Sequence, residues 1–320
     1  MGLYNELWGL WKGLTDMLAP KPVFKTDQIP DLSGQVMLVT GANTGIGKET
    51  VKVLLQHNAK VYLAARSKEK AEAAIEDLKK QTGKEAIFLE LDLLNFPSIR
   101  KAAEEFLSKE NELHVLFNNA GVMIPPVDML SPDGYDLQLM TNVIGPFFFT
   151  KLLLPAILAA KATHPDHHSR IITTSSSGAY LYTLNFDTFR DSPARKKMST
   201  QNLYFQTKFA NAVIGRQYAK RYAEQGLISI ALNPGNIETD LQRHLHVPAF
   251  VLNIARSLLL HPVDRGALTQ LYAGTMPEAV NHNGGFLIPW ARVGRCRPEA
   301  YDDALGERLY AWLEEQVKDK

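Results

Sequence analysis

The chain has a single cysteine, Cys296, among its 320 residues, so it cannot form an internal disulfide. It also has no Asn-x-Ser/Thr glycosylation acceptor, and its first residues lack the basic start and apolar run of a signal peptide. Small secreted proteins usually depend on disulfides, whereas reducing compartments keep thiols free. These absences favour a cytoplasmic location, with peripheral attachment to a membrane surface as an alternative that the N-terminus raises.

The chain also has no excess of charge of one sign, because it contains 35 basic and 34 acidic side chains and its formal net charge is +1. Nucleic acid is therefore not expected as a partner. No stretch reaches the roughly 18 uninterrupted apolar residues of a membrane span. A composition of 45% hydrophobic and 22% charged residues instead predicts a globular protein with a sizeable core, most simply one domain.

From Val36 onward, short apolar runs alternate with helical patterns. VMLVT, KVYLAA and AIFLELD each precede a helix, expected to end near Gln56, Gly83 and Lys109, and VLFNNAG, RIITTSS and LISIALNPG follow as further strands. This alternation predicts an α/β fold, a single-domain Rossmann-like doubly wound parallel sheet with helices on both faces. The apolar segment 146–161 is expected to be a buried helix. In such sheets ligands bind at the carboxyl ends of the strands.

We divide the chain into an N-terminal amphipathic helix and linker (1–34) and a folded domain (35–320). The domain includes an apolar lid at about 240–262 and a C-terminal helix at about 301–318. In the first segment, leucines recur at helical spacing from Gly2 to Leu18, and Pro20 ends the pattern. This helix packs on its own domain or on a partner subunit such as the second copy in a homodimer, or it contacts a membrane through residues 2–18. Glu6 stands where a myristoylation motif needs Ser or Thr.

The first strand runs into a glycine-rich turn, TGANTGIG, followed by a helical pattern. Gly41 permits a tight turn, Gly45 lets the backbone approach a pyrophosphate, and Gly47 lets the helix lie close to the strand. A nucleotide-triphosphate P-loop would need Gly and Ser or Thr where Ala42 and Glu49 stand. The turn therefore predicts a dinucleotide site.

The end of the second strand indicates which dinucleotide binds. NAD-binding folds place an acid roughly twenty residues after the glycines, where it holds the ribose 2′-hydroxyl. Here Ala65 stands in that place and Arg66 follows, so a 2′-phosphate meets a guanidinium instead of a carboxylate. NADP(H) is the expected cofactor, with Lys68 or Lys70 able to share the contact. The alternative is that Arg66 is only a solvated residue at a strand end.

From about Gln35 to Ile288, these and further motifs resemble the short-chain dehydrogenase/reductase family. The glycine spacing TGxxxGxG, the NNAG turn ending at Gly121, and the pair Tyr204 and Lys208 in YFQTK follow the family's order. The resemblance implies an NADP-dependent oxidoreductase that acts on CH–OH groups. Within the family, VYLAARS, the LNF segment at 184–186 and the long spacing from Ser176 to Tyr204 are similar to the retinol dehydrogenase-like and WW-domain oxidoreductase-like branch. That spacing predicts an inserted loop at about 182–200.

The same resemblance implies roles for individual residues. The catalytic group it implies is Asn142, Ser176, Tyr204 and Lys208. The cofactor contacts, taken with the glycine turn and the second strand, are Gly41, Asn43, Thr44, Gly45, Ile46, Gly47, Arg66, Asp92, Leu93, Asn119, Ala120, Gly121, Tyr204, Lys208, Pro234, Gly235, Ile237 and Thr239. By resemblance, Asp92 contacts the adenine, Lys208 the ribose and Thr239 the nicotinamide carboxamide, while Asn142 helps to position a water.

Carbonyl reduction builds negative charge on the substrate oxygen, so the site needs a proton donor and a hydrogen-bond donor there. Tyr204 is the expected acid and Ser176 the second donor. A free tyrosine has a pKa of about 10, and Lys208 at i+4 on the same helix face is expected to favour the phenolate. No metal is expected, because His164, His167 and His168 are interpreted as residues of a solvated loop without acid or cysteine companions.

The substrate and the direction of the reaction are less constrained. The segment LQRHLHVPAFVLNIARSLLLHP is strongly apolar, which favours a lipophilic ketone, aldehyde or alcohol, although Phe250 to Ile254 could equally pack on the core or on a subunit. The competing function is a catalytically silent NADP(H)-binding regulator or scaffold of the same fold. Such a protein has no need of the full set of serine, tyrosine, lysine and asparagine, so the set favours an enzyme.

Overall fold

The computed structural model describes residues 2–17, 19–238 and 260–320. Its centre is an eight-stranded sheet in the order β3-β2-β1-β4-β5-β6-β7-β8, in which only the β7–β8 pair is antiparallel. The strands are β1 (Val36–Thr40), β2 (Lys60–Ala65), β3 (Ile87–Glu90), β4 (Val115–Asn118), β5 (Ser169–Thr174), β6 (Leu227–Leu232), β7 (Phe286–Ile288) and β8 (Arg292–Gly294). The predicted doubly wound sheet is confirmed. Strand order reverses between β1 and β4, and this switch point is where such folds bind ligands.

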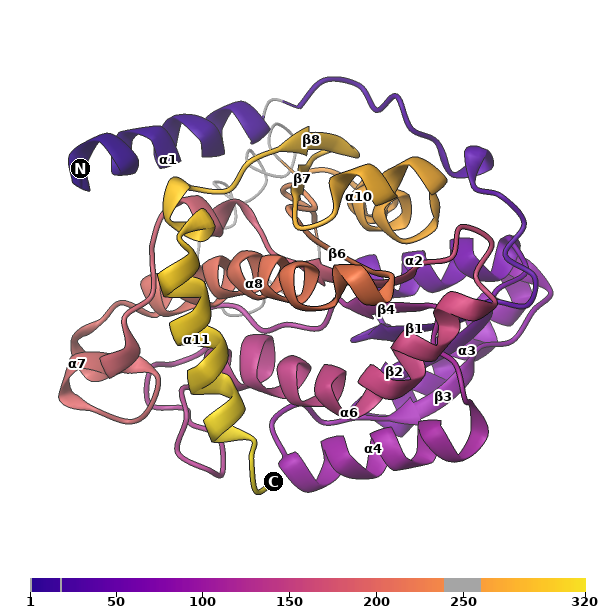
Figure 1. Ribbon diagram of the computed structural model, residues 1–320, viewed down its shortest axis with the longest axis horizontal. Coiled ribbons are helices and arrows are strands. Elements are labelled where there is room, and N and C mark those ends of the chain that lie inside the picture. Colours follow the sequence, from indigo (N-terminus) through magenta and orange to yellow (C-terminus); the bar gives the residue numbers. More distant parts are fainter. Residues whose placement is uncertain (1, 18, 239–259) are drawn as a thin grey trace.

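Helices cover both faces of the sheet (Figure 1). One face carries α2 (Gly45–Gln56), α3 (Lys68–Thr82) and α10 (Val263–Thr275), and the other carries α4 (Phe96–Lys109), α6 (Gly145–Ala159) and α8 (Thr200–Tyr222). Side chains of β1 alternate between two cores, with Val36 and Leu38 on the α4 side and Met37 and Val39 on the α2 side. Because both faces are buried, these strands read as continuous apolar runs in the sequence.

The apolar segment before β5 forms one long helical stretch made of α5 (Leu137–Leu139), the π-helical η2 (Met140–Ile144), α6 and the 3-10 turn η3 (Ala160–Ala162). From Leu137 to Ala162 it is long and apolar enough to cross a membrane, which a search for uninterrupted apolar runs misses because polar residues such as Asn142 and Lys151 interrupt it. However, 67% of its most apolar window is buried inside the protein. The stretch is therefore packed as a core helix of the domain.

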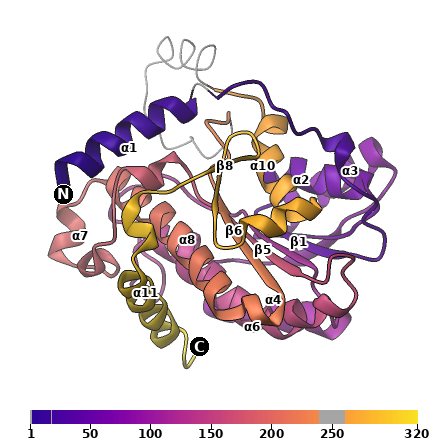
Figure 2. The ribbon, with the colours of Figure 1, turned by 45° about the horizontal axis from the view of Figure 1, so that its top comes forward.

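Beyond β8 the chain returns to the α6 and α8 side. After the turn η9 (Pro298–Tyr301), helix α11 (Asp303–Gln316), expected at about 301–318, lies along α8 (Figures 1 and 2). Tyr310 contacts Phe147 edge-to-face with ring centroids 5.2 Å apart, and Leu313 is fully buried. Helix α11 thus covers part of the outer side of α6 and α8.

The segment expected to be an inserted loop runs from Tyr182 to the start of α8 at Thr200. It contains the turn η5 (Phe186–Thr188) and the short helix α7 (Pro193–Lys197). Arg195 of α7 is almost fully buried and pairs with Asp136 at 2.9 Å, and it also donates to the carbonyl oxygen of Met129 at 2.9 Å. The loop is therefore pinned to residues just before α5.

The remaining short elements are the N-terminal helix α1 (Gly2–Met17), η1 (Thr26–Gln28), η4 (Ser177–Tyr180), η6 (Ala223–Gln225) and η8 (Pro277–His282). Helix α1 packs on η4, the turn that follows β5, rather than on the sheet itself. Most of the predicted lid, 240–262, lies outside the described residues. At its base, Ile237 pairs with His261 in a parallel bridge.

Candidate active site

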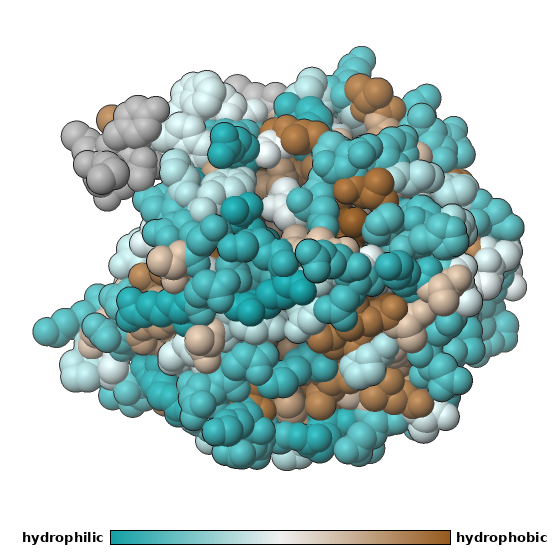
Figure 3. Space-filling model, viewed as in Figure 1, coloured by the Kyte–Doolittle hydropathy of each residue, from teal (hydrophilic) through white to brown (hydrophobic). Residues whose placement is uncertain are grey.

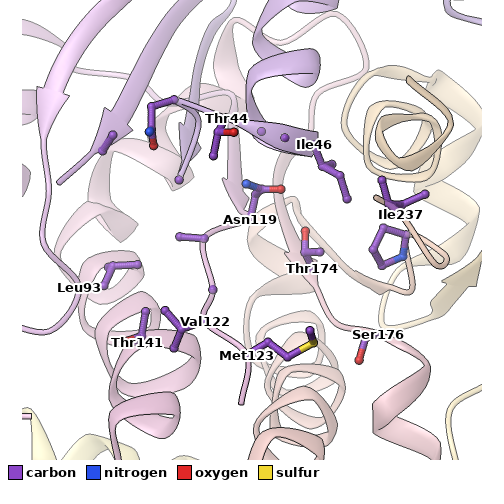
Figure 4. A pocket seen from close by; sticks show the side chains of 18 of the residues that line it. Thr44, Ile46, Leu93, Asn119, Val122, Met123, Thr141, Thr174, Ser176 and Ile237 are labelled. Atoms are coloured by element: carbon purple, nitrogen blue, oxygen red, sulfur yellow. The ribbon is translucent and has the colours of Figure 1, made fainter. Parts of the chain in front are cut away.

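A cavity of about 1140 Å³ opens at the carboxyl ends of the central strands. Its walls come from the loops after β1, β2, β3, β4, β5 and β6 and from the first half of α8. Figure 4 shows Thr44 and Ile46 on the wall formed by the loop after β1, with Asn119, Val122 and Met123 along the loop after β4 and Ser176 after β5. The cavity therefore lies at the switch point of the sheet.

The glycine-rich turn forms the entrance to α2. Gly41 has φ +66° and Gly45 φ +56°, conformations that side chains rarely adopt, and a Cβ on Gly41 would lie 2.8 Å from the Cα of Ala120. A Cβ on Gly47 would lie 2.6 Å from the Nδ2 atom of Asn119. Helix α2 begins at Gly45 and its first turn lines the cavity, so its N-terminus can accept a phosphate group.

The Thr40 hydroxyl group joins this turn to the NNAG turn after β4. It accepts hydrogen bonds from the backbone N–H groups of Asn119 at 3.1 Å and Ala120 at 3.0 Å. The Asn119 side chain donates back to the Thr40 carbonyl oxygen at 2.8 Å. Asn118 points the other way and donates to Thr150 of α6 at 3.0 Å. The NNAG motif thus fixes the two turns that face each other across the switch point.

At the far end of the cavity, the carboxyl ends of β2 and β3 provide Ala65, Arg66, Asp92 and Leu93. Ala65 is buried, whereas Arg66 is exposed, and Lys70 of α3 lines the same end. The Asp92 carboxylate accepts a hydrogen bond from Leu94 N–H at 3.0 Å, which holds the loop after β3. This end offers cationic groups and no acid in the position where an NAD-binding fold would have one.

Ser176 and Tyr204 meet at the opposite end. Tyr204 is 5% exposed and interacts with Ser176 through a side-chain hydrogen bond. Burial raises the pKa of Tyr204 to about 12, while the hydrogen bond with Ser176 acts in the opposite direction. The Ser176 hydroxyl oxygen accepts from Gly178 N–H at 3.0 Å, and its own O–H donates toward the Tyr204 oxygen, since this contact lowers the Tyr204 pKa.

Lys208 lies one helical turn beyond Tyr204, with its Nζ atom 5.7 Å from the centre of the Tyr204 ring. It donates to the Thr174 carbonyl oxygen at 3.1 Å, and burial lowers the pKa of Lys208 to about 8. Burial disfavours the charged forms of both side chains. The expectation that Lys208 favours the Tyr204 phenolate stays a prediction.

Asn142 belongs to the π-helical turn η2 and lies behind the cavity wall. Its amide holds both backbone groups of Val122, accepting from N–H at 2.8 Å and donating to the carbonyl oxygen at 3.0 Å. It also donates to Thr207 of α8 at 3.0 Å. A Cβ on Gly121 would lie 3.2 Å from the Asn142 Oδ1 atom and 3.4 Å from the Lys208 Nζ atom. Gly121 thus leaves these two polar groups room to approach the cavity.

The cavity brings together almost every residue singled out from the sequence. Of the four expected catalytic residues, Ser176, Tyr204 and Lys208 line it and Asn142 lies behind it; of the cofactor residues, all but Thr239 line it. Thr239 lies outside the described residues. Sequence motifs missed the wall made by Val122, Met123, Pro125, Met129 and Phe205. Phe205 follows Tyr204 directly, and the others follow the NNAG turn, so adjacency to the motifs was the available signal.

The histidine-rich loop is only partly the solvated loop expected from the sequence, because His167 is exposed and His168 half-buried but His164 is not exposed. His164 is buried and its Nδ1 atom lies 2.5 Å from the Asp166 carboxylate, with its ring 5.9 Å from that of His114. The acid companion is therefore present, two residues away. Among the residues that the structure describes, no group of three or more His, Cys, Asp or Glu side chains is arranged to hold a metal ion.

Two kinds of similarity place the chain among known proteins. The family model for short chain dehydrogenases matches residues 35–186. A short-chain dehydrogenase/reductase from Armillaria gallica is 58% identical over 309 residues, covering 97% of this chain and 98% of that protein. An uncharacterized oxidoreductase from Schizosaccharomyces pombe is 38% identical, with 96% of this chain and 91% of that protein covered.

Solved structures agree with this placement. A protein from Mycobacterium paratuberculosis has 27% identity and a TM-score of 0.71 over 92% of this chain and 97% of its own. Two structures with lower identity share the fold: a 3-ketoacyl-(acyl-carrier-protein) reductase from Brucella melitensis with NADH (24%, TM-score 0.61, 80% and 96% covered) and a gluconate 5-dehydrogenase from Burkholderia cenocepacia with NADP and tartrate (22%, TM-score 0.63, 80% and 93% covered). The chain belongs to the short-chain dehydrogenase/reductase family of oxidoreductases.

Proposed function

We propose that this protein is an NADP(H)-dependent carbonyl reductase or alcohol dehydrogenase for a lipophilic ketone, aldehyde or alcohol, with Tyr204 as the general acid and base. The observation that carries the proposal is the arrangement of one cavity: Tyr204, Ser176 and Lys208 lie at one end and the exposed Arg66 at the other. The family membership supplies the oxidoreductase class, and the residues of this chain supply the finer assignment.

The cavity fits a dinucleotide. The positive-φ turn at Gly41 and Gly45 and the N-terminus of α2 suit a diphosphate, and Gly47 keeps the helix close to the strand. Ile237, Pro234 and Gly235 close the wall beside the reactive end. When bound, the nicotinamide would supply or accept the hydride. The roles of the protein are to bind and orient both molecules and to handle the proton.

Proton handling falls to Tyr204. With its pKa near 12, the phenol keeps its proton throughout the physiological range, so it is in the form needed to protonate a carbonyl oxygen during reduction. Ser176 offers a second O–H, since its oxygen already accepts from Gly178 N–H. The Lys208 ammonium, with a pKa near 8, carries its charge in most molecules at neutral pH and would stabilise negative charge forming beside it.

The preference for NADP(H) rests on Arg66, supported by Lys70 at the same end of the cavity. A guanidinium can form two hydrogen bonds with a 2′-phosphate, and buried Ala65 contributes no competing carboxylate. The Brucella and Burkholderia structures hold NADH and NADP respectively, so the shared fold accepts either cofactor and the choice depends on these side chains.

The lipophilic substrate is inferred from apolar residues of the cavity lining that have no expected role in cofactor binding. These residues are Val122, Met123, Pro125, Met129, Leu137, Phe205 and Leu260. Hydrogen bonds from Arg195 to the Met129 carbonyl oxygen and from Thr200 to the Pro125 carbonyl oxygen at 2.8 Å hold the rim in place. An apolar wall with few polar groups near the reacting atoms favours apolar substrates.

We also propose a cytoplasmic protein that touches membranes through α1. Three large apolar side chains of α1 are exposed, namely Leu7 (58%), Leu10 (55%) and Trp11 (61%). The molecular face that Figure 3 shows is mostly hydrophilic, with separate apolar patches. Replacing these three residues by serine should abolish co-sedimentation with anionic liposomes. Equal sedimentation of wild type and triple variant would remove the membrane proposal.

The decisive experiment for the enzyme proposal measures NADPH oxidation at 340 nm with a panel of hydrophobic ketones and aldehydes of increasing chain length. We expect turnover that improves with chain length and is far weaker with NADH. Tight NADPH binding without turnover of any carbonyl, or of the corresponding alcohols with NADP, would favour the silent regulator instead. A preference for small polar carbonyls would keep the enzyme but reject the lipophilic substrate.

A further inference from the structure

The N-terminal helix α1 is seated on the turn that begins directly after Ser176. This turn, η4, spans Ser177–Tyr180, and Ser176 is its N-cap residue. The two elements come from opposite parts of the chain, since Asp16 and Tyr180 are 164 positions apart. In Figures 1 and 2, α1 lies at one end of the molecule, away from the sheet. Its described contacts are therefore concentrated on one element of the active site.

The contact is close because α1 has a glycine where it meets the turn. A Cβ on Gly9 would overlap the carbonyl oxygen of Tyr180, whereas a Cβ on Gly13, one turn further along the same helix, would have no other atom within 4 Å. Beside Gly9, the rings of Trp8 and Tyr180 pack edge-to-face with centroids 5.8 Å apart. Gly9 is thus the point at which the helix backbone rests on η4.

A buried polar contact fixes the same pair of elements. The Tyr180 hydroxyl group donates to the Asp16 carboxylate at 2.7 Å, and the other oxygen of Asp16 pairs with the Lys12 ammonium at 2.5 Å. Tyr180 is fully buried and Asp16 is 4% exposed. A buried carboxylate is stable only when its hydrogen bonds are made, so this contact specifies the position of Tyr180 strongly.

On its other side, η4 packs against the catalytic helix α8. A Cβ on Gly178 would lie 2.7 Å from the Phe205 ring and 3.0 Å from the Ser176 hydroxyl oxygen. Near the C-terminus, Arg297 donates to the Tyr180 carbonyl oxygen at 3.4 Å. The turn that orients Ser176 is therefore held between α8 and α1, and a shift of Tyr180 would be passed on to Ser176 through only three intervening residues.

We propose that α1 is a positioning element of the active site, in which Gly9 and Asp16 hold Tyr180 and thereby fix the Ser176 hydroxyl group beside Tyr204. This proposal rests on the proposed oxidoreductase function. It assigns Asp16, Gly9 and Tyr180 as positioning residues, because none of them lines the cavity. The glycine-rich turn at the start of α2 makes no part of this contact, so binding of the cofactor's phosphates should not depend on it.

The first test compares Gly9→Ala with Gly13→Ala. Both changes favour helix formation, but only Gly9→Ala forces α1 away from η4. We expect Gly9→Ala to lower kcat for carbonyl reduction about tenfold while the NADPH KM changes less than about twofold, since displacing a reacting group by about 1 Å can cost up to 10²-fold. Gly13→Ala should behave like wild type.

The second test removes the buried hydroxyl contact with Tyr180→Phe. Tyr62→Phe is its control. Tyr62 lies in β2, is also buried and also donates a hydrogen bond to a carboxylate, that of Glu110, at 2.5 Å. Tyr180→Phe should lower kcat and Tyr62→Phe should not. In a Ser176→Ala background the Gly9→Ala change should have no further effect on kcat, because its influence is passed on through Ser176.

Hydrogen–deuterium exchange separates this proposal from the proposed function. The amides of Gly178, Ala179 and Leu181 are bonded within the turn and should exchange faster in Gly9→Ala and Tyr180→Phe, while those of α2 stay unchanged. Faster exchange without any wild-type turnover would reject the enzyme and keep α1 as the element that orders the turn. Unchanged exchange, or equal kcat in Gly9→Ala and Gly13→Ala, would overturn the positioning role.

Discussion

Tyr204 and Lys208 are both buried. Burial raises the pKa of Tyr204 to about 12 and lowers the pKa of Lys208 to about 8. Between about pH 8 and pH 12 the pair is therefore predominantly a neutral phenol and a neutral amine. The phenol proton is held firmly, which suits protonation of a carbonyl oxygen in the reductive direction. In the oxidative direction the same residue must first lose that proton, so alcohol oxidation should need a higher pH than carbonyl reduction.

Tyr204→Phe removes only this hydroxyl group. We expect single-turnover carbonyl reduction to fall by about 10² to 10⁴, the usual contribution of a general acid, with NADPH affinity nearly unchanged. Lys208→Ala should impair both reduction and cofactor affinity, because the ammonium lies between the Thr174 carbonyl oxygen and the cavity. Rapid-mixing measurements at saturating NADPH would give these rates. A Tyr204→Phe variant that keeps more than about a tenth of the wild-type rate would falsify the assignment.

Arg66→Ala tests the cofactor preference at the other end of the cavity. Losing one charge-assisted hydrogen-bonding group typically costs about 1.5 to 3 kcal/mol, so NADPH affinity should fall about ten- to hundredfold while NADH affinity stays the same. Arg100→Ala is the matched control, because Arg100 is also an exposed arginine and does not line the cavity. Fluorescence titration of both cofactors would measure the effect. Equal binding of NADH and NADPH by the wild type would contradict the preference.

At the scale of helices and strands, the sequence predicted the elements that begin or end at a capping residue or a glycine. Helix α3 begins after the N-cap Ser67 and ends before Gly83 in the left-handed region, as its sequence pattern requires. The antiparallel β8 has only three residues and lies in a Pro- and Gly-containing stretch, so no periodic pattern marked it. The contact of α1 with η4 depends on Gly9 and Asp16 meeting a distant tyrosine, and sequence spacing carries no such information.

Helix α11 gives a prediction at this scale. Leu313 is fully buried on the side that faces α6 and α8, so Leu313→Ala should lower the free energy of unfolding by about 2 to 5 kcal/mol. Glu315→Ala, an exposed position on the same helix, should change it by less than about 0.5 kcal/mol. Urea titrations followed by circular dichroism would compare them. Similar midpoints for the two variants would mean that α11 is not part of the cooperative core.

At the scale of the whole molecule, the two ends of the sheet serve different purposes. The carboxyl ends carry the cavity, while the amino ends are joined by buried polar groups. His114, just before β4, accepts a hydrogen bond from Val36 N–H of β1 at 3.0 Å through its Nδ1 atom. Asp166 pairs with Arg170, which donates to the carbonyl oxygens of Ala273 at 3.1 Å and Met276 at 2.9 Å near the end of α10. These contacts connect the sheet to the helices of the α2 side.

These buried polar groups affect the free energy of unfolding in two different pH ranges. Burial lowers the pKa of His114, with the His164 ring nearby acting in the same direction. Burial opposes ionisation of Asp166, but the hydrogen bond with His164 and the charge of Arg170 outweigh it and hold the pKa of Asp166 below its usual range. The stability that depends on Asp166 is therefore present above its ordinary pKa of about 3.9 and is lost only below it. Above pH 5, the change should come from His114.

His114 should make the fold less stable as the pH falls below about 6.5. Its Nδ1 atom must stay unprotonated to accept from Val36, and with the pKa lowered in the folded state the unfolded chain binds the proton first. Each pH unit between the unfolded and folded pKa values then removes up to about 1.4 kcal/mol. His114→Gln, whose amide oxygen can still accept from Val36, should flatten the decline between pH 7 and 5, whereas His167→Gln at an exposed position should not. Parallel curves of unfolding free energy against pH for wild type and His114→Gln would show that the proton is taken up elsewhere.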